Sequence, residues 1–200
     1  MSVTVYGDSL SGNCYKIKLL CALLDIDMNW VEVDILAGTT KTPEFLALNP
    51  NAKIPVLVTE DDKVLSESNA ILYYLAKDTL FFPEDHFQQT LCLQWMCFEQ
   101  YSHEPYIAVA RFINKYLNLP KDRLEEYQSK QEGGYKALSI MEQQLLKVPY
   151  LLGSCLSIAD IALFAYTHVA DEGGFDLDKF PAITAWLAEI KKQKGFIAIG

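Results

Sequence analysis

Residues 55–67 read PVLVTEDDKVLSE, and in this stretch the polar turn 60–63 separates two short apolar runs. Apolar runs of this length joined by a polar turn predict a β-hairpin. The next residues, 69–77, read NAILYYLAK and have the apolar spacing of a helix. The chain from 55 to 77 is therefore expected to fold as strand, strand and helix.

The residues before this hairpin alternate between the two types of regular structure. The segments 3–6 and 30–33 alternate like strands, whereas 14–24 has apolar residues at helical spacing. Thr42 and Pro43 are typical of a helix start, with Thr42 as the N-cap and Pro43 at the first helical position. The predicted order is β-α-β-α-β-β-α, which is a small α/β domain with one hairpin.

Strand signals stop after residue 78, so residues 1–78 are predicted to form one domain. Residues 79–86 are expected to be a linker, and 87–200 an all-helical domain that begins with a long helix over 87–116. Pro105 should kink or interrupt that helix, because proline lacks the amide hydrogen and crowds the preceding turn. The remaining helices are expected over 121–147, 157–171 and 182–194.

Residues 156–161 read LSIADI and mark a helix start in the second domain. Ser157 can cap the amide of Asp160 while the Asp160 side chain reaches back, as in a capping box with Asp in place of the usual Glu or Gln. Leu156 and Ile161 occupy the positions of a hydrophobic staple. The helix that follows is apolar nearly all round, so we expect it at the buried centre of the helical domain.

The composition excludes several classes of partner. The chain has 200 residues, 50% of them hydrophobic, and a net charge of -9 with a pI near 4.8. This acidity opposes a nucleic acid or an anionic membrane as the main partner. The sequence shows neither an apolar run of about 18 residues nor a signal peptide, so we expect a cytoplasmic protein without a membrane span.

The cysteines favour reduced thiols over a disulfide framework. Five cysteines are an odd number, and they form no C-x-x-C pair and no zinc-spaced cluster with histidine. We therefore predict no internal disulfide and no structural metal. The five are Cys14, Cys21, Cys92, Cys97 and Cys155.

Three motifs within this two-domain order resemble the cytosolic glutathione transferase family. Residues 11–14 (SGNC) are similar to the serine-type active-site turn of theta-like bacterial members, and 49–57 (NPNAKIPVL) to the loop and proline before the third strand. Residues 67–71 (ESNAI) resemble the family's Glu/Gln-Ser pair at a helix start. The resemblance covers essentially the whole chain. It implies a thioredoxin-like N-terminal domain, glutathione as co-substrate, a homodimer with a role in detoxification, and an electrophile pocket from the helical domain.

The resemblance places the chemistry in the turn before the first helix. A free thiol with a pKa near 8.5 is only about 3% ionised at pH 7, so a transferase must favour the thiolate of glutathione. Ser11 stands three residues before Cys14, where theta-like relatives carry their catalytic serine. Asn13 can donate from its side-chain amide or cap the helix. Ser9 can support the turn or replace Ser11, and Tyr6 is expected to have a packing role.

Cys14 offers a competing chemistry. A cysteine of low pKa at a helix N-terminus forms mixed disulfides and would favour reductase or dehydroascorbate-type activity. However, Cys14 lies on one helical stripe with Ile17, Cys21 and Leu24. Cys14 is therefore expected to be a small buried hydrophobic side chain.

The helix start at 67–71 suits one of the two carboxylates of glutathione. Ser68 can donate from its hydroxyl and its amide at the positive end of the helix, and Glu67 can pair with the ammonium group of the ligand. The alternative is that Ser66 or Ser68 only caps the helix, as such residues do in any protein.

Ile54 and Pro55 form the second expected contact with glutathione. The resemblance implies a cis bond between them, which would turn the Ile54 amide and carbonyl toward the backbone of a peptide-like ligand. An ordinary trans proline at an edge strand is the alternative. Lys53 and Lys41 are candidate partners of the glycine carboxylate of glutathione, or else solvated surface lysines.

The electrophile pocket is expected on 98–116, where several aromatic side chains accompany a single arginine. His103, Tyr106 and Arg111 are the candidates. Aromatic side chains at helical spacing more often belong to a core, and that alternative applies to all three.

The leading hypothesis is a glutathione transferase in which Ser11 stabilises bound glutathione as thiolate for attack on a small electrophile. A glutathione-dependent isomerase of the maleylacetoacetate type, or a peroxidase, is the second hypothesis, because SLSGNC partly matches the turn of the isomerases. The third is a transferase-like binding module without catalysis.

Overall fold

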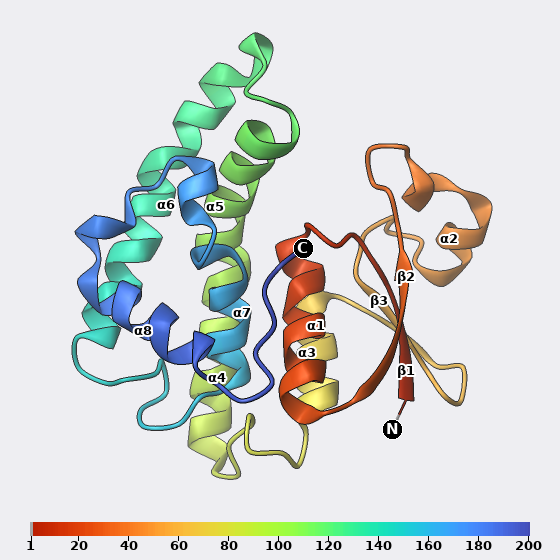
Figure 1. The fold of residues 1–200 in the computed structure, drawn as a ribbon, viewed down its shortest axis with the longest axis horizontal. Coiled ribbons are helices and arrows are strands. Elements are labelled where there is room, and N and C mark those ends of the chain that lie inside the picture. The colour runs from red at the N-terminus through yellow and green to blue at the C-terminus, as the bar shows by residue number, and fades with distance from the viewer. Residues whose placement is uncertain (1) are drawn as a thin grey trace. The chain divides into compact units, whose positions relative to one another are not determined.

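The computed structural model describes residues 2–200, and its elements are labelled in Figure 1. The chain forms two compact units, of which the first contains the residues up to Lys77 together with Gln193–Gly200 and the second contains Asp78–Lys192. The last eight residues therefore differ from the expected 87–200 helical domain, because they pack with the N-terminal unit. Each unit is described by itself.

The first unit contains a four-stranded sheet in the order β2-β1-β3-β4. β1 pairs in parallel with β2 and antiparallel with β3, and β3 and β4 form the antiparallel hairpin that the sequence predicts. Val3 and Val5 alternate inward along β1 and are buried. The strands are β1 (Ser2–Gly7), β2 (Asp27–Glu32), β3 (Val56–Thr59) and β4 (Val64–Ser66).

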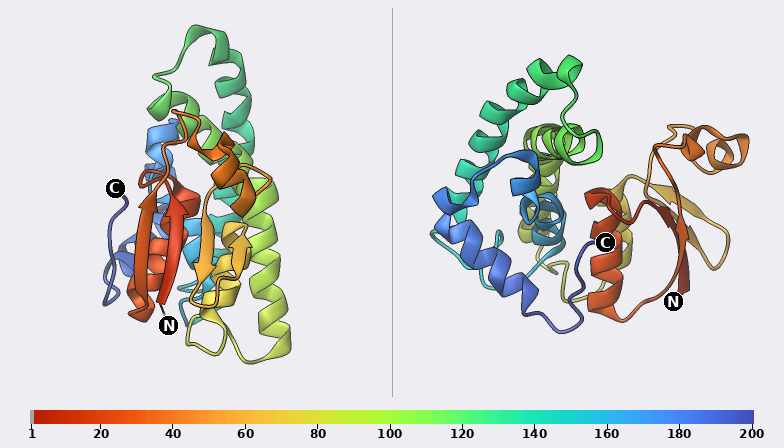
Figure 2. Two further views of the ribbon diagram at one scale, coloured as in Figure 1. Left: turned by 90° about the vertical axis from the view of Figure 1, so that its right-hand side faces the viewer. Right: turned by 45° about the horizontal axis from the view of Figure 1, so that its top comes forward.

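The helices of this unit complete the predicted β-α-β-α-β-β-α order, which is the thioredoxin-like fold. α1 and α3 lie side by side on one face of the sheet, as Figures 1 and 2 show. Thr42 caps α2 and Pro43 is its first residue, as predicted. The helices are α1 (Gly12–Leu24), α2 (Pro43–Leu48) and α3 (Ser68–Ala76), with a short 3-10 turn at Thr39–Lys41.

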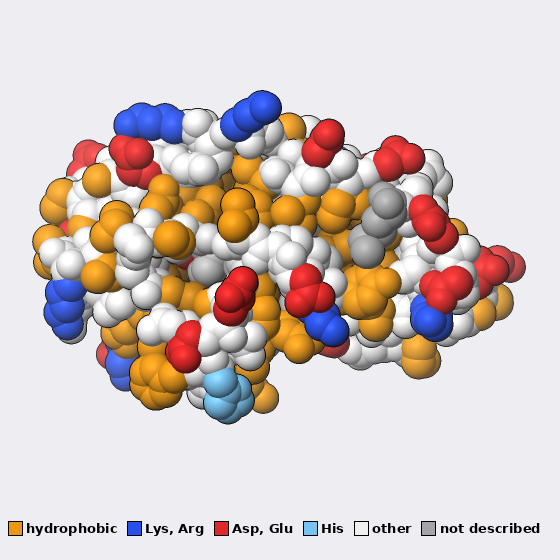
Figure 3. All heavy atoms as spheres, turned by 90° about the horizontal axis from the view of Figure 1, so that it is seen from below, with side chains coloured by type: hydrophobic (Ala, Val, Ile, Leu, Met, Phe, Trp, Pro, Cys, Tyr) orange, Lys and Arg blue, Asp and Glu red, His pale blue; other side chains and the backbone are white. Residues whose placement is uncertain are grey.

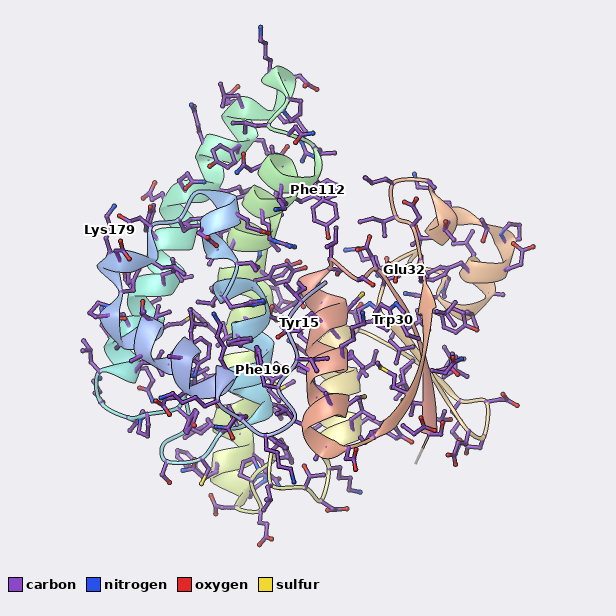
Figure 4. The ribbon with its side chains drawn as sticks, in the orientation of Figure 1. Tyr15, Trp30, Glu32, Phe112, Lys179 and Phe196 are labelled. Atoms are coloured by element: carbon purple, nitrogen blue, oxygen red, sulfur yellow. The ribbon has the colours of Figure 1, made fainter. Side chains whose placement is uncertain are left out.

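The C-terminal segment Gln193–Gly200, called the tail below, is hydrogen-bonded to α1. Tyr15 is fully buried, and its hydroxyl donates a hydrogen bond to the Ile197 carbonyl at 2.6 Å. Gly195 has a φ of +88°, and a Cβ there would lie 2.6 Å from the Ala22 carbonyl oxygen. Glycine is thus the residue that lets the tail approach the helix backbone so closely. Figure 4 labels Tyr15 of α1 and Phe196 of the tail.

The regular elements of the second unit are helices, apart from an isolated β-bridge between Tyr150 and Gly153. The long helix expected over 87–116 is present, but two of its segments are π-helical. The first π segment ends just before Pro105, which removes an amide donor and crowds the preceding turn. The elements are α4 (His86–Phe98), π segment η2 (Glu99–His103), α5 (Glu104–Arg111), π segment η3 (Phe112–Tyr116), α6 (Leu124–Leu145), α7 (Ile158–Thr167) and α8 (Pro181–Lys191), with 3-10 turns at Lys121–Arg123, Ala170–Gly173 and Leu177–Lys179.

α7 is the buried centre of the helical unit, and every one of its residues is buried. Its start has the predicted capping box. The Asp160 carboxylate accepts hydrogen bonds from the Ser157 amide at 2.9 Å and the Ser157 hydroxyl at 2.8 Å. It also accepts from the Leu151 amide at 2.9 Å and the Trp186 indole at 3.0 Å. Burial raises the pKa of the Asp160 carboxyl, and these four donors oppose that shift.

Three features are relevant to nucleic acid, membrane and metal as partners: the surface charge, the length and apolarity of the helices, and the grouping of metal-binding side chains. On the face drawn in Figure 3, Lys and Arg side chains stand among acidic and hydrophobic ones and form no continuous basic track. Within residues 2–200, none of the helices is both long enough and apolar enough to cross a bilayer. Over the same described residues, His, Cys, Asp and Glu side chains form no group of three suited to a metal ion.

Candidate active site

The turn between β1 and α1 presents the Ser11 hydroxyl. Ser11 is the N-cap of α1, and its oxygen accepts the Cys14 amide at a long 3.4 Å. Its own amide donates to the Asp8 carbonyl at 3.1 Å. The Ser11 side chain also hydrogen-bonds with the Cys14 thiol, and this bond opposes the rise of the Cys14 pKa. The hydroxyl therefore stands beside a sulfur atom at the positive end of a helix dipole.

Cys14 is fully buried, as its position on the apolar stripe predicts. Burial raises the pKa of the Cys14 thiol to about 12. A Cβ on Gly7 would lie 2.8 Å from the Cys14 sulfur, so the thiol is packed tightly under the strand end. A thiol with this pKa is protonated at neutral pH and is a poor nucleophile.

Ser9 is engaged in a different network from that of Ser11. The Ser9 hydroxyl donates to Glu32 Oε2 at 2.7 Å, and the Ser9 amide donates to Glu32 Oε1 at 2.8 Å. The Lys18 ammonium also donates to the Ser9 hydroxyl oxygen, at 3.3 Å. The Ser9 proton is therefore already committed, which distinguishes this serine from Ser11.

The start of α3 meets the start of α1 through side-chain hydrogen bonds. Ser68 is buried, and its hydroxyl donates to Asn13 Oδ1 at 3.2 Å. Lys16 donates to the Ser68 hydroxyl at 3.2 Å and to Asn69 Oδ1 at 3.3 Å. Glu67 precedes them as the exposed N-cap of α3, with a φ of +67°. The geometry thus joins Asn13 and Ser68, two residues that the sequence places far apart.

Lys16 is the residue of this group that the sequence analysis missed. Its side chain is fully buried, although lysine is among the residues least often found inside a protein. The available signal was a charged residue within the apolar run of α1, between Tyr15 and Ile17. A buried ammonium that donates to Ser68 fixes the orientation of the Ser68 hydroxyl.

Ile54 and Pro55 are joined by the cis peptide bond that the family resemblance implies. Within residues 2–200, no hydrogen bond uses the Ile54 amide or carbonyl. The preceding residue is held in place because the Asn49 side chain donates to the Lys53 carbonyl at 2.7 Å. The Lys53 and Lys41 side chains are exposed and form no ion pair within the described chain.

Two of the expected electrophile residues have polar partners inside the helical unit. His103 is fully buried, and its Nε2 lies 2.8 Å from the Thr167 hydroxyl. Arg111 is buried as well and donates from Nε to Glu172 Oε2 at 2.7 Å. Burial alone would raise the pKa of the Glu172 carboxyl, but bonds from Arg111 and Lys115 outweigh it and lower the pKa.

Tyr106 lies on another side of the same helix. Its ring packs against Gly133 of α6, where a Cβ would be 2.2 Å from a ring carbon. It borders a cavity of about 110 Å³. Tyr106 thus has neighbours that differ from those of His103 and Arg111. The cavity is lined by Tyr101, Ser102, Tyr106, Gly133, Lys136, Ala137 and Ile140.

Comparison with known proteins assigns a family to both units. Residues 1–77 match the family model described as Glutathione S-transferase, N-terminal domain, and residues 94–194 match the one described as Glutathione S-transferase, C-terminal domain. A crystal structure of a glutathione S-transferase from Pseudomonas fluorescens Pf-5 has a TM-score of 0.97 and 56% sequence identity, and the match covers 98% of each chain.

Two further similarities concern activity and ligand. The protein named Disulfide-bond oxidoreductase YfcG, from Escherichia coli strain K12, is 30% identical over 190 residues, which cover 90% of this chain and 86% of that one. The structure described as Ure2p in complex with glutathione has a TM-score of 0.85 and 23% identity, covering 96% and 95% of the two chains. At that identity the likeness shows the fold alone.

Proposed function

The chain belongs to the glutathione S-transferase family, and we propose that its Ser11 hydroxyl donates a hydrogen bond to the sulfur of bound glutathione. The bond favours the thiolate, which then attacks an electrophilic carbon of a small molecule. A carbon-sulfur bond forms, and the leaving group departs with the electron pair of the broken bond. The thiol proton is released to water before the attack.

The observation that carries this proposal is the place of the Ser11 hydroxyl, at the N-terminus of α1 and with no carboxylate or carbonyl acceptor among its hydrogen-bond partners within residues 2–200. Ser9 donates to Glu32, and Cys14 is buried with its pKa raised, so neither matches Ser11 as a donor to an incoming thiol. A pKa shift of roughly two units makes most of the thiol ionised at pH 7 and corresponds to about 2.7 kcal/mol. A hydroxyl donor and a helix N-terminus are two sources of that stabilisation.

The other predicted residues supply the remaining contacts of glutathione in this proposal. The unbonded Ile54 amide and carbonyl, next to Pro55, suit the peptide backbone of the ligand. The Ser68 hydroxyl donates to Asn13, so of the two expected donors it is the Ser68 amide at the start of α3 that suits one carboxylate, with Glu67 next to it for the ammonium group. Lys53 and Lys41 are proposed partners of the second carboxylate, and Asn13 supports Ser68 through the bond between them.

The decisive experiment is conjugation of glutathione to an activated aryl halide. We expect Ser11→Ala to lower turnover about ten-fold or more, equivalent to roughly 1.4 kcal/mol, with a near-normal KM for glutathione. Tyr6→Phe is the matched control, because it removes the competing hydroxyl at the end of β1. Unchanged turnover in Ser11→Ala would remove Ser11 from the mechanism, and a loss in Tyr6→Phe would move the role to Tyr6.

A second candidate function is reduction of small disulfides by glutathione, which the name of the Escherichia coli relative suggests. In this reaction the glutathione thiolate attacks a disulfide sulfur, and a second glutathione resolves the mixed disulfide. The two glutathione molecules leave joined as oxidised glutathione, and both sulfur atoms of the substrate leave as thiols, so glutathione is the reductant. Because Cys14 is buried, we expect Cys14→Ala to retain any such activity, measured with hydroxyethyl disulfide.

The isomerase and peroxidase alternatives use the same thiolate and are separated by their products. Isomerisation of maleylacetone without consumption of glutathione identifies an isomerase. Formation of oxidised glutathione in the presence of a hydroperoxide identifies a peroxidase. A binding module without catalysis would show none of these products. A module that does not take glutathione would also show no thermal shift at millimolar glutathione.

We further propose that the chain acts as a cytoplasmic homodimer in detoxification, as the family resemblance implies. The helical unit is proposed to supply the electrophile pocket, with His103, Tyr106 and Arg111 as candidate residues. Light scattering should give a mass near twice the 22.6 kDa of one chain. A mass of one chain would refute the dimer and leave the Ser11 proposal unaffected.

A further inference from the structure

Glu32 lies directly beside the point where the active-site turn leaves the sheet. It is the last residue of β2, and in the parallel pair it stands opposite Gly7, the last residue of β1. The turn 8–11 begins at the next residue. Figure 4 labels Glu32 and Trp30 close together on this strand.

The Glu32 carboxylate holds three donors, although the residue lies at the surface. The Ser9 amide and hydroxyl donate to its two oxygens at 2.8 and 2.7 Å, and the Trp30 indole donates to Oε2 at 2.6 Å. Lys18 lies 4.0 Å from the Trp30 ring centroid and donates to Ser9. Hydrogen bonds to a charged acceptor are about twice as strong as neutral ones. The carboxylate thus joins β2 to the turn, and Lys18 of α1 binds the same Ser9.

The turn is also fixed from within. The Leu10 amide donates to Asp8 Oδ1 at 2.8 Å, and the Ser11 amide donates to the Asp8 carbonyl at 3.1 Å. Between these bonds, Ser9 is the residue of the turn that is anchored to the neighbouring strand. Ser11 follows two residues later, so the place of its hydroxyl depends on where the Ser9 backbone is held.

We propose that Glu32 is a positioning residue, which fixes the Ser9 backbone and through it the place of the Ser11 hydroxyl relative to the glutathione sulfur. This inference rests on the proposed role of Ser11. This role requires no contact of Glu32 with glutathione or with the electrophile. Its action is mechanical: it removes freedom from the turn, so that the hydroxyl is already oriented when the thiol arrives.

Positioning of Ser11 by Glu32 would lower the pKa of the bound thiol, whereas the negative charge of Glu32 would raise it. A variant without the carboxylate therefore distinguishes the positioning role from the charge effect. A carboxylate near the sulfur disfavours the thiolate by like-charge repulsion. Asp8 and Asp34 add negative charge to the same region, and Lys18 offsets part of it. Burial would raise the pKa of the Glu32 carboxyl, but the bonds from Trp30 and Ser9 outweigh burial and lower it, so Glu32 is charged at assay pH.

The test compares Glu32→Gln with Asp34→Asn. Both changes remove one negative charge, but Asp34→Asn leaves the Ser9 contacts intact and keeps an acceptor for the Leu36 and Ala37 amides. The thiolate of bound glutathione is titrated by ultraviolet absorbance from about pH 5 to 9, together with kcat/KM for an activated aryl halide. Thermal unfolding of each variant confirms that it is folded.

We expect Glu32→Gln to raise the apparent pKa of the bound thiol and to lower kcat/KM at pH 6.5 about five-fold. Asp34→Asn should leave that pKa unchanged or lower it slightly. Trp30→Phe, which removes one donor to Glu32 but keeps a ring beside Lys18, should give a smaller shift in the direction of Glu32→Gln. This variant also serves if Glu32→Gln does not fold.

Two results would overturn the inference. One is a thiol pKa that falls in Glu32→Gln as it does in Asp34→Asn, because Glu32 would then act by charge. The other is an unchanged profile in both Glu32→Gln and Trp30→Phe. The double variant Ser11→Ala with Glu32→Gln separates this inference from the proposed function. If Ser11→Ala alone has no effect, the proposed function fails; if Ser11→Ala reduces activity and Glu32→Gln reduces it equally in both backgrounds, only the positioning role fails.

Discussion

Ser11 and Ser157 both begin a helix, but their hydroxyl groups are used in different ways. Ser157 is buried, and its hydroxyl donates to the Asp160 carboxylate at 2.8 Å. Ser11 is partly exposed, accepts a long bond from the Cys14 amide, and has the Cys14 thiol as its side-chain partner. The first serine completes a closed network with a buried carboxylate, whereas the second has only weak partners and is the proposed donor to a ligand.

The difference shows that a capping residue reveals a helix start but not its purpose. Ser157 stabilises the fold because a buried carboxylate takes its proton, whereas Ser11, with weaker partners, is proposed to serve chemistry. At Asp160, four donors converge on one buried carboxylate, so a change there acts on the whole helical unit. At Ser11, the proposal predicts that a change acts mainly on the bound thiol.

The largest expected effect is on the Ser157 side of this comparison. Asp160→Asn replaces one acceptor oxygen by a donor, which faces donors it cannot satisfy. We expect the free energy of unfolding to fall by about 3 kcal/mol, because buried donors lose their partner. Denaturant unfolding measures the loss, and Asp178→Asn, an exposed carboxylate with no side-chain hydrogen bond, is the control. Equal stability of the two variants would contradict a structural role for the box.

The next effect concerns His168, the residue that follows α7 at its other end. Burial lowers the pKa of His168 from 6.5 to about 4. The unfolded chain therefore binds the proton more readily, and stability is lost as the pH falls from about 6.5 to 4. The expected loss is roughly 3 kcal/mol at the low end of that window.

Denaturant unfolding across this pH window should show a smaller loss in His168→Gln than in the unmodified chain. His86→Gln, at an exposed histidine, should leave the loss unchanged. A pH dependence that is identical in His168→Gln would show that other groups are responsible.

The two serines themselves provide the third test. Ser157→Ala should lower the free energy of unfolding by about 1 to 2 kcal/mol, because it removes a buried cap. Ser11→Ala should lower it by less than about 1 kcal/mol, because its capping bond is long. Conjugation activity should show the reverse order. A Ser11→Ala protein that is less stable than Ser157→Ala would contradict the view that Ser157 is the structural cap and Ser11 is not.

The smallest effect is on cysteine labelling. Cys97 and Cys155 are exposed and should react quickly with a thiol reagent in the folded protein. Cys14, the partner of the Ser11 cap, should react only after unfolding, because it is buried and its pKa is raised to about 12. Mass spectrometry of peptides after brief labelling measures this order. Fast labelling of Cys14 in the folded protein would show that its thiol is accessible and would make it a candidate nucleophile again.

Much of the fold follows from local sequence patterns. The hairpin, the Thr42 cap and the Ser157 box depend on residues close in sequence, and all three are present in the structure. The irregular backbone before Pro105 follows from the chemistry of proline in the same way. The return of the tail to the first unit does not, because the contact between Tyr15 and Ile197 joins positions at opposite ends of the chain.

The candidate site was predictable to a lesser extent for the same reason. The family resemblance suggested Ser11, Ile54 and Ser68, and it implied the cis bond at Pro55. It gave no sign of Lys16 or Glu32, because their partners are set by how α1, α3 and β2 meet. Single polar residues in a pattern do not reveal which distant group will accept their hydrogen bonds.

The fastening of the tail to α1 has a consequence for biosynthesis. The segment Gln193–Gly200 contributes to the first unit, yet it leaves the ribosome after the whole helical unit has been made. The unit that is synthesised first is thus completed last, because the hydrogen bond from Tyr15 to the Ile197 carbonyl can form only when translation is nearly finished. The order of assembly is the reverse of the usual N-terminal-first order of multidomain proteins.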